Sequence, residues 1–138
     1  MNPIVRNILA VLAGIVVGSI VNMGIIQLGP SVIPQPEGVD NSTMESLAAT
    51  MHLFKAKHFI VPFLAHALGT LVGAFIAAKI AVSHKMRFAL GLGVFFLLGG
   101  IAAVFMLPAP MWYNVTDLVL AYIPMAYLGG KMAVKKSE

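Results

Sequence analysis

The sequence predicts an all-α integral membrane protein: a bundle of four membrane-spanning helices, with a short amphipathic helix in the loop after the first span. Two observations predict this class. Of 138 residues, 59% are hydrophobic and only 10% are charged, whereas soluble domains carry about 25% charged residues. The charges also leave three long stretches free, at 7–36, 58–78 and 88–116. Soluble enzymes, disordered tails and nucleic-acid-binding proteins are therefore excluded, and the lipid bilayer is the first expected partner.

The first predicted span runs from about Val5 to Leu28. Arg6 precedes this hydrophobic run, as a basic residue does in a signal peptide. The run continues to about Ile26, however, and no small-x-small cleavage motif follows it, so we expect an uncleaved span. The sequence has no cysteine, which excludes thiol redox chemistry, cysteine-ligated zinc and disulfide bonds.

The second and third predicted spans cover about 58–82 and 86–107. Each provides the roughly 20 apolar residues that a helix needs to cross a hydrocarbon core about 30 Å thick. The third span contains twelve Leu, Ile, Val or Phe residues between Phe88 and Leu107 and no polar side chain. At their usual insertion energies these residues contribute on the order of −5 kcal/mol, so the third span is the strongest of the four.

The fourth predicted span, at about 111–130, is marginal. It contains only six such residues and it carries Asp117, which costs up to roughly 3 kcal/mol at the centre of a membrane helix. We therefore expect this segment to insert only if the carboxyl group is protonated, hydrated or turned toward another helix. The whole chain, 1–138, then forms a single transmembrane domain.

The basic residues predict the orientation of these spans. Only Lys55 and Lys57 fall on one side of the four-span arrangement. The other side carries Arg6, Lys79, Lys85, Arg87, Lys131, Lys135 and Lys136. The positive-inside rule places that second side, with both chain termini, in the cytoplasm.

The loop at 29–57 holds most of the chain outside the predicted spans. Its first part is rich in proline and glycine and is therefore expected to be irregular. The run Ser42–Glu45 then has the form of a capping box, which satisfies amide donors at a helix start. Apolar residues follow at helical spacing on one face, at Met44, Leu47, Ala48 and Met51. These features predict a short amphipathic helix that lies on the outer interface or covers the bundle.

Two segments of the sequence resemble each other. Residues 74–82 align with 126–134 at four identical and five conservative positions. The first and third spans align more weakly, for example through Arg6 with Arg87. This internal similarity predicts two parallel copies of a helical hairpin, an arrangement that occurs in transporters.

Small residues predict where the helices pack, because lipid gives helices no hydrophobic reason to associate and close backbone contact must replace it. They recur at helical spacing in the first three spans. The predicted packing residues are Gly14, Gly18, Gly69, Gly73, Gly99 and Gly100. The simplest interpretation is packing within one chain. Four helices make a thin bundle, however, so we also expect a homo-oligomer.

Polar side chains on three spans are predicted to meet. Asn22 continues the small-residue stripe of the first span, and His66 lies on the small-residue face of the second. Together with Asp117 they lie roughly 9–12 Å below the outer surface. We expect these three side chains to converge, with Asn114, Thr70 and His58 as further polar members on the same faces.

Three roles for this cluster stay open at the sequence level. It is a structural lock if Asp117 only accepts hydrogen bonds that fix helix register. It is a binding or translocation site if the imidazole and carboxylate hold a polar head group or carry a proton. A metal-dependent interfacial enzyme is the third reading, although His58 and His66 lack the i, i+4 spacing of an HExxH motif. No metal or other cofactor is expected.

The segments Lys57–Gly69 and Pro108–Trp112 resemble those of small four-span inner-membrane proteins of bacteria, a family without an assigned activity. The resemblance implies a bacterial inner-membrane protein and carries over no catalytic residue. The sequence thus predicts a non-enzymatic membrane protein whose polar pocket opens toward the outer leaflet. Such a protein binds lipid or a small amphiphile, or serves as an accessory subunit. The main alternative is a small proton-linked transporter or channel.

Overall fold

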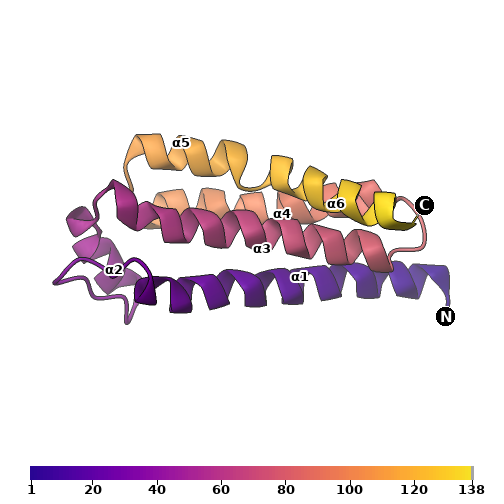
Figure 1. Cartoon of the computed structure of the whole chain (residues 1–138), viewed down its shortest axis with the longest axis horizontal. Helices are drawn as coiled ribbons and strands as arrows, with labels where there is room; N and C mark the ends of the chain where they lie inside the picture. Colours follow the sequence, from indigo (N-terminus) through magenta and orange to yellow (C-terminus); the bar gives the residue numbers. More distant parts are fainter. Residues whose placement is uncertain (138) are drawn as a thin grey trace.

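The computed structural model describes residues 1–137, with side chains to residue 134, and every regular element in that part of the chain is helical. Three long helices, α1 (Pro3–Leu28), α3 (Ile60–Ile80) and α4 (Lys85–Met106), run the length of the molecule. Helices α5 (Met111–Leu120) and α6 (Ile123–Ser137) follow one another along α3 (Figure 1). The short α2 (Met44–Thr50) lies at one end, and both chain termini lie at the other (Figure 1).

Three helical segments of residues 1–137 are long and apolar enough to cross a membrane: Pro3–Ser31, Ala56–Ile80 and Lys85–Met106. The first and third include a row of large apolar side chains that face outward. Leu98 is 60% exposed and Phe105 is 87% exposed, for example. Such a surface is expected against lipid and is rare on a soluble monomer. These helical segments lie where the first three spans are predicted, to within a few residues.

The fourth predicted span, at about 111–130, is not one continuous helix, because the structure divides this segment into α5 and α6. Pro124 has no amide hydrogen to donate to the carbonyl of Leu120, so the helical ladder is interrupted there. The Ala121 amide still bonds the Asp117 carbonyl at 2.9 Å, and a new ladder starts where the Ala126 amide bonds the Tyr122 carbonyl at 2.8 Å. Alone, the two helices extend only about 15 and 22 Å.

Glycines hold α1 against α3, as the small-residue spacing predicts. A Cβ atom on Gly14 would lie 2.6 Å from the carbonyl oxygen of Gly73, and one on Gly73 would lie 2.7 Å from that of Gly14. Gly18 and Gly69 stand in the same reciprocal relation, at 2.7 and 2.9 Å. Any side chain at these four positions would separate the two backbones, so only glycine permits this crossing.

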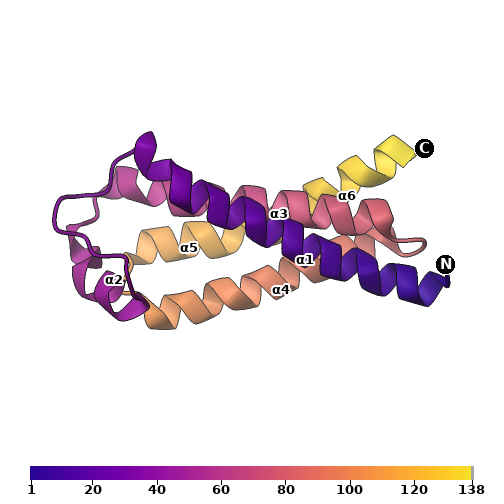
Figure 2. The ribbon, with the colours of Figure 1, turned by 90° about the horizontal axis from the view of Figure 1, so that it is seen from below.

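Helix α3 is the central helix of the molecule, in contact with α1, α4 and α6. Near the termini these helices pack through small side chains. The buried core there consists of Ala74, Ala77, Ala78, Ala89, Leu92, Ala126 and Ala133. Toward the other end α1 and α4 diverge (Figure 2). The backbones of α1 and α4 are therefore farther apart at the α2 end than near the termini.

The two segments of similar sequence, 74–82 and 126–134, lie mainly in α3 and α6. These two helices run in the same direction (Figure 1). Both contribute alanines to the core described above. The parallel course agrees with a repeated hairpin, and the duplication itself stays a prediction.

Basic side chains bind the carboxyl end of α3. The Arg6 guanidinium donates to the Ile80 carbonyl at 2.8 Å, and Lys85 Nζ donates to the carbonyls of Ala78 and Ala81 at 3.1 and 2.7 Å. Cations are favourable at this end of a helix, where unpaired carbonyls carry partial negative charge. Lys135 and Lys136 lie outside the side chains that the structure describes.

The predicted amphipathic helix exists as α2, but its cap differs by one residue from the prediction. The Thr43 side chain, not that of Ser42, accepts the capping hydrogen bond, from the Ser46 amide at 3.0 Å. Ser42 instead donates its hydroxyl and its amide to Asp40, at 2.7 and 2.9 Å. These two bonds, the hydroxyl first, lower the pKa of the Asp40 carboxyl below its usual value.

Candidate functional site

Asp117 is the buried carboxylate of the site. It belongs to α5, and only 5% of the residue is exposed. Its Oδ1 lies 2.8 Å from Nδ1 of His66 and accepts a weaker bond from the Tyr113 hydroxyl at 3.5 Å. Its Oδ2 accepts from the Tyr122 hydroxyl at 3.2 Å. Three polar side chains therefore surround the carboxyl group of Asp117. The sequence predicts such partners, because an isolated carboxylate is costly in a membrane span.

His66 contacts Asp117 from the neighbouring helix α3. Its ring stacks on that of Tyr122, with centroids 5.8 Å apart and planes inclined by 25°. The His66 side chain keeps 25% of its surface exposed, against 7% for Asp117. The carboxylate is thus enclosed, and the imidazole is the more exposed member of the pair.

The hydrogen bonds define what the pair does chemically. An ionised Asp117 accepts from both tyrosine hydroxyls and from a proton on Nδ1 of His66. Nε2 of the neutral imidazole is then left as an acceptor. Within the described residues, Nε2 of His66 makes no hydrogen bond. The pair therefore presents one open hydrogen-bonding atom.

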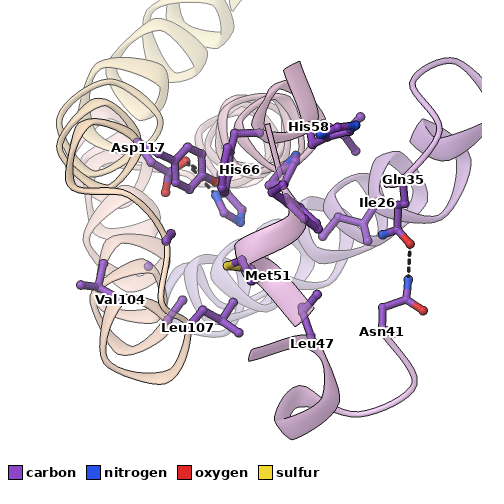
Figure 3. A pocket seen from close by; sticks show the side chains of 18 of the residues that line it. Ile26, Gln35, Asn41, Leu47, Met51, His58, His66, Val104, Leu107 and Asp117 are labelled. Carbon is purple, nitrogen blue, oxygen red and sulfur yellow. Dashed lines mark hydrogen bonds and ion pairs between the residues drawn. The ribbon is translucent and has the colours of Figure 1, made fainter. Parts of the chain in front are cut away.

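A largely apolar cavity of about 300 Å³ lies below α2, and we call it the roofed chamber (Figure 3). Met44, Leu47 and Met51 cover it from α2 and the turn that follows. The ends of α1 and α4 and the beginnings of α3 and α5 form its walls. Asp117 and His66 both line it. The roofed chamber thus combines an apolar interior with a single buried acid–imidazole pair.

A second cavity, of about 330 Å³, lies between α1, α3 and α4, and we call it the side chamber. It is lined by Gly18, Ser19, Asn22, His66, Gly69, Thr70, Phe95, Phe96, Gly99, Gly100, Ala103 and Tyr122. His66, Gly100 and Ala103 also line the roofed chamber. The two cavities are therefore neighbours that share these three residues in their linings.

Not all of the predicted polar residues meet at Asp117. Asn22 and Thr70 line the side chamber, and neither bonds to the carboxylate. His58 lines the roofed chamber, where its Nδ1 accepts from the Lys55 amide at 2.8 Å. Asn114 lines neither chamber, because its amide turns back to the Ala109 carbonyl at 3.5 Å. The expected convergence therefore holds for His66 and Asp117 only. Of the other four residues, two line the side chamber, one lines the roofed chamber and one lines neither.

The sequence reasoning missed both tyrosines. Tyr113 lies four residues before Asp117, so the i, i+4 relation of helical side chains was available as a signal. Tyr122 lies five residues after it, which on a continuous helix would turn its side chain away by about 140°. The interruption between α5 and α6 brings the Tyr122 hydroxyl to Asp117. No sequence spacing indicated this contact.

Two predicted packing glycines behave differently around the side chamber. A Cβ on Gly100 would lie 2.6 Å from the Tyr122 hydroxyl oxygen, so this glycine makes room for that ring. A Cβ on Gly99 would meet no atom of the described chain within 4 Å. Gly99 is exposed and lies at the rim of the side chamber, with open space where a side chain would stand. Its predicted packing role stays a prediction.

Within residues 1–137, no three His, Cys, Asp or Glu side chains lie close enough together to hold a metal ion. Comparison of the chain with protein-family models, with curated proteins and with solved structures found no match.

Proposed function

We propose that the chain crosses the bacterial inner membrane four times, with α5 and α6 together forming the fourth crossing. The three long apolar helices support membrane insertion, and α5 followed by α6 extends along α3 (Figure 1). Arg6, Lys79, Lys85, Arg87 and Lys131 belong to the end that holds both termini, whereas Lys55 and Lys57 belong to the α2 end. The positive-inside rule then places the termini in the cytoplasm and α2 at the outer surface.

In this membrane the protein binds a small amphiphile, without catalysing a reaction. The single observation that carries this proposal is the roofed chamber, an apolar cavity of about 300 Å³ with the Asp117–His66 pair in its lining. Ligand pockets are characteristically apolar with a few placed polar groups that orient the ligand. An apolar group gains by leaving the membrane interface for such a chamber. A polar group on the same ligand finds a hydrogen-bonding partner in Nε2 of His66.

The amphipathic helix α2 favours a ligand taken from the lipid phase. Leu47 and Met51 turn toward the chamber (Figure 3), while Glu45 on the same helix is exposed. The helix therefore separates an apolar interior from water, as interfacial amphipathic helices do. An accessory role in a larger membrane assembly, or in a homo-oligomer of this chain, is compatible with the same site.

The test is to fill the roofed chamber. Val104 lines it from α4, whereas Ala102 on the same helix is exposed and lines neither chamber. Protein in nanodiscs of phosphatidylethanolamine and phosphatidylglycerol is labelled with a photoreactive dodecan-1-ol, with and without excess unlabelled dodecan-1-ol. We expect saturable labelling of Leu47 and Met51 that falls at least about tenfold in Val104→Trp and is unchanged in Ala102→Trp. Labelling that does not saturate, or that is equal in the two variants, would contradict the proposal.

A specific observation also favours proton-linked transport as a second candidate. The helix that carries Asp117 is interrupted four residues after it, at 121–122. Interrupted helices beside a buried ionisable group are typical of transporter binding sites. On this reading, proton uptake into proteoliposomes loaded with a pH-sensitive dye requires Asp117. Equal uptake by Asp117→Asn and wild type, or no uptake by either, would exclude this candidate.

A further inference from the structure

The side chamber has a polar lining that amphiphile binding in the roofed chamber does not use. Ser19 and Asn22 reach it from α1 and Thr70 from α3. The Asn22 side chain is half-buried and makes no hydrogen bond within the described part of the chain. An amide held between three helices without a partner is able to donate and to accept for a bound group.

We infer that the side chamber holds the head group of the amphiphile, and that this head group is an uncharged hydroxyl or amide. This inference rests on the proposed function, since the apolar part of the same ligand occupies the roofed chamber. His66, which lines both chambers, marks the place where the two parts of the ligand join.

The charges around the side chamber select an uncharged group. Among the side chains that the structure describes, no Lys, Arg, Asp or Glu lines this cavity. A phosphate or carboxylate would have no cation to pair with and would lie near the Asp117 carboxylate behind the His66 ring. An ammonium group would leave water for a cavity without a carboxylate among its described lining residues, and the nearby Asp117 already accepts hydrogen bonds from His66, Tyr113 and Tyr122. The cation would therefore have no direct partner, which is costly for a charge. A hydroxyl or amide proton instead matches Nε2 of His66, and its oxygen matches the Asn22 amide.

The ligand reaches this site from the side of the molecule. Ser19 on α1 and Phe95 and Gly99 on α4 line the chamber and are exposed, and α1 and α4 diverge at this level (Figure 2). In a membrane-spanning chain this surface faces acyl chains. An uncharged amphiphile is therefore able to pass directly from the bilayer into the chamber, whereas a charged head group would stay at the interface.

The test compares four C12 compounds that differ only in the head group: dodecane, dodecan-1-ol, dodecanoate and dodecylammonium. Each competes with a photoreactive dodecane bound to the full chain in nanodiscs, and affinities are expressed per mole fraction in the bilayer. We expect dodecan-1-ol to bind about tenfold more tightly than dodecane, because its hydroxyl adds hydrogen bonds that dodecane cannot make. The two charged compounds are expected to bind no better than dodecane.

Two variants with matched controls assign this preference to the side chamber. Asn22→Leu removes the amide, and Gln27→Leu is its control on an exposed part of α1. Gly99→Trp obstructs the rim, and Gly91→Trp is its control, since a Cβ at either glycine meets no atom of the described chain within 4 Å. Asn22→Leu and Gly99→Trp should reduce the preference for the alcohol to about twofold or less while dodecane still binds. Both controls should keep the full preference.

The possible failures are distinguishable. If photoreactive dodecane does not bind at all, the proposed function fails and this inference fails with it. If dodecane binds and the alcohol preference is absent, or survives both Asn22→Leu and Gly99→Trp, only the inference on the head group is overturned. A preference for dodecanoate or dodecylammonium also overturns it.

Discussion

Nδ1 of His66 lies 2.8 Å from Oδ1 of Asp117, and this contact joins two helices through residues that are 51 positions apart in the sequence. It connects α5, which is too short to cross a membrane alone, to the long helix α3. Because the Tyr122 ring stacks on the same imidazole and its hydroxyl reaches the same carboxylate, the contact also fixes the chain where α5 ends. The pair is thus both a structural junction and part of the lining of the roofed chamber.

Replacement of Asp117 by Asn is expected to leave the fold and the oligomer size intact. The side chains have the same shape, and His66 is able to exchange tautomers and accept from the new amide. Hydrogen bonds inside membranes average about 0.6 kcal/mol, so we expect Asp117→Asn to lower the free energy of unfolding by no more than about 1 kcal/mol. Denaturation in mixed micelles and size-exclusion chromatography measure this. Loss of the folded bundle would show that Asp117 is a structural lock.

Of the two tyrosines, Tyr122 is expected to contribute more to stability. Its hydroxyl lies 3.2 Å from Asp117, and 3% of the residue is exposed, whereas the Tyr113 hydroxyl lies 3.5 Å away. Tyr122→Phe should lower the free energy of unfolding by about 1 kcal/mol. Tyr113→Phe, measured in the same micelles, should cost clearly less. The reverse order would contradict the hydrogen-bond geometry described here.

The crossing of α1 and α3 depends on glycine, so an added methyl group is expected to be destabilising there and harmless elsewhere on α1. A Cβ on Gly14 would lie 2.6 Å from a backbone carbonyl oxygen, whereas one on Gly24 would meet no atom of the described chain within 4 Å. We expect Gly14→Ala to cost about 1–3 kcal/mol and Gly24→Ala to be neutral. Thermal unfolding of the two variants in detergent tests this, and equal midpoints would refute the close crossing.

The cap of α2 provides a prediction that is independent of the membrane. Thr43→Ala removes the side-chain acceptor at the helix start and should destabilise α2 by about 1 kcal/mol. Hydrogen exchange of the amides in 44–50 measures this local stability. Ser42→Ala is the control, because Ser42 bonds Asp40 and not the helix. Faster exchange in Ser42→Ala than in Thr43→Ala would show that Ser42 caps the helix, as the sequence predicts.

Much of the architecture was predictable because membrane insertion makes strong demands on sequence. The three long apolar helices, the amphipathic α2 and the glycine crossing all follow from residue type and helical spacing. The contact between His66 and Asp117 followed from the cost of leaving a carboxylate in hydrocarbon. Each of these predictions depends either on the spacing of residues within one helix or on the large free-energy cost of an unpartnered carboxylate in a membrane.

Other features depend on geometry that one-dimensional spacing does not contain. Pro124 marks the interruption at 121–122 in the sequence, but helical spacing does not show that the interruption brings Tyr122 to Asp117. Gly99 is exposed, and Asn22 lines the side chamber and does not contact Asp117. Asn114, which helical spacing assigned to the same face as Asp117, satisfies its amide locally at the Ala109 carbonyl. Helical wheels assume straight, evenly packed helices, and these residues lie where that assumption fails.

The occupancy of the space below α2 tests the central claim most directly. A density map of the protein purified in lipid nanodiscs, to a resolution that shows side chains, should contain an elongated feature between α2 and the imidazole of the third helix. The same feature should be missing when Trp replaces Val104. A map in which α2 sinks onto the helices and leaves no room there would contradict the claim.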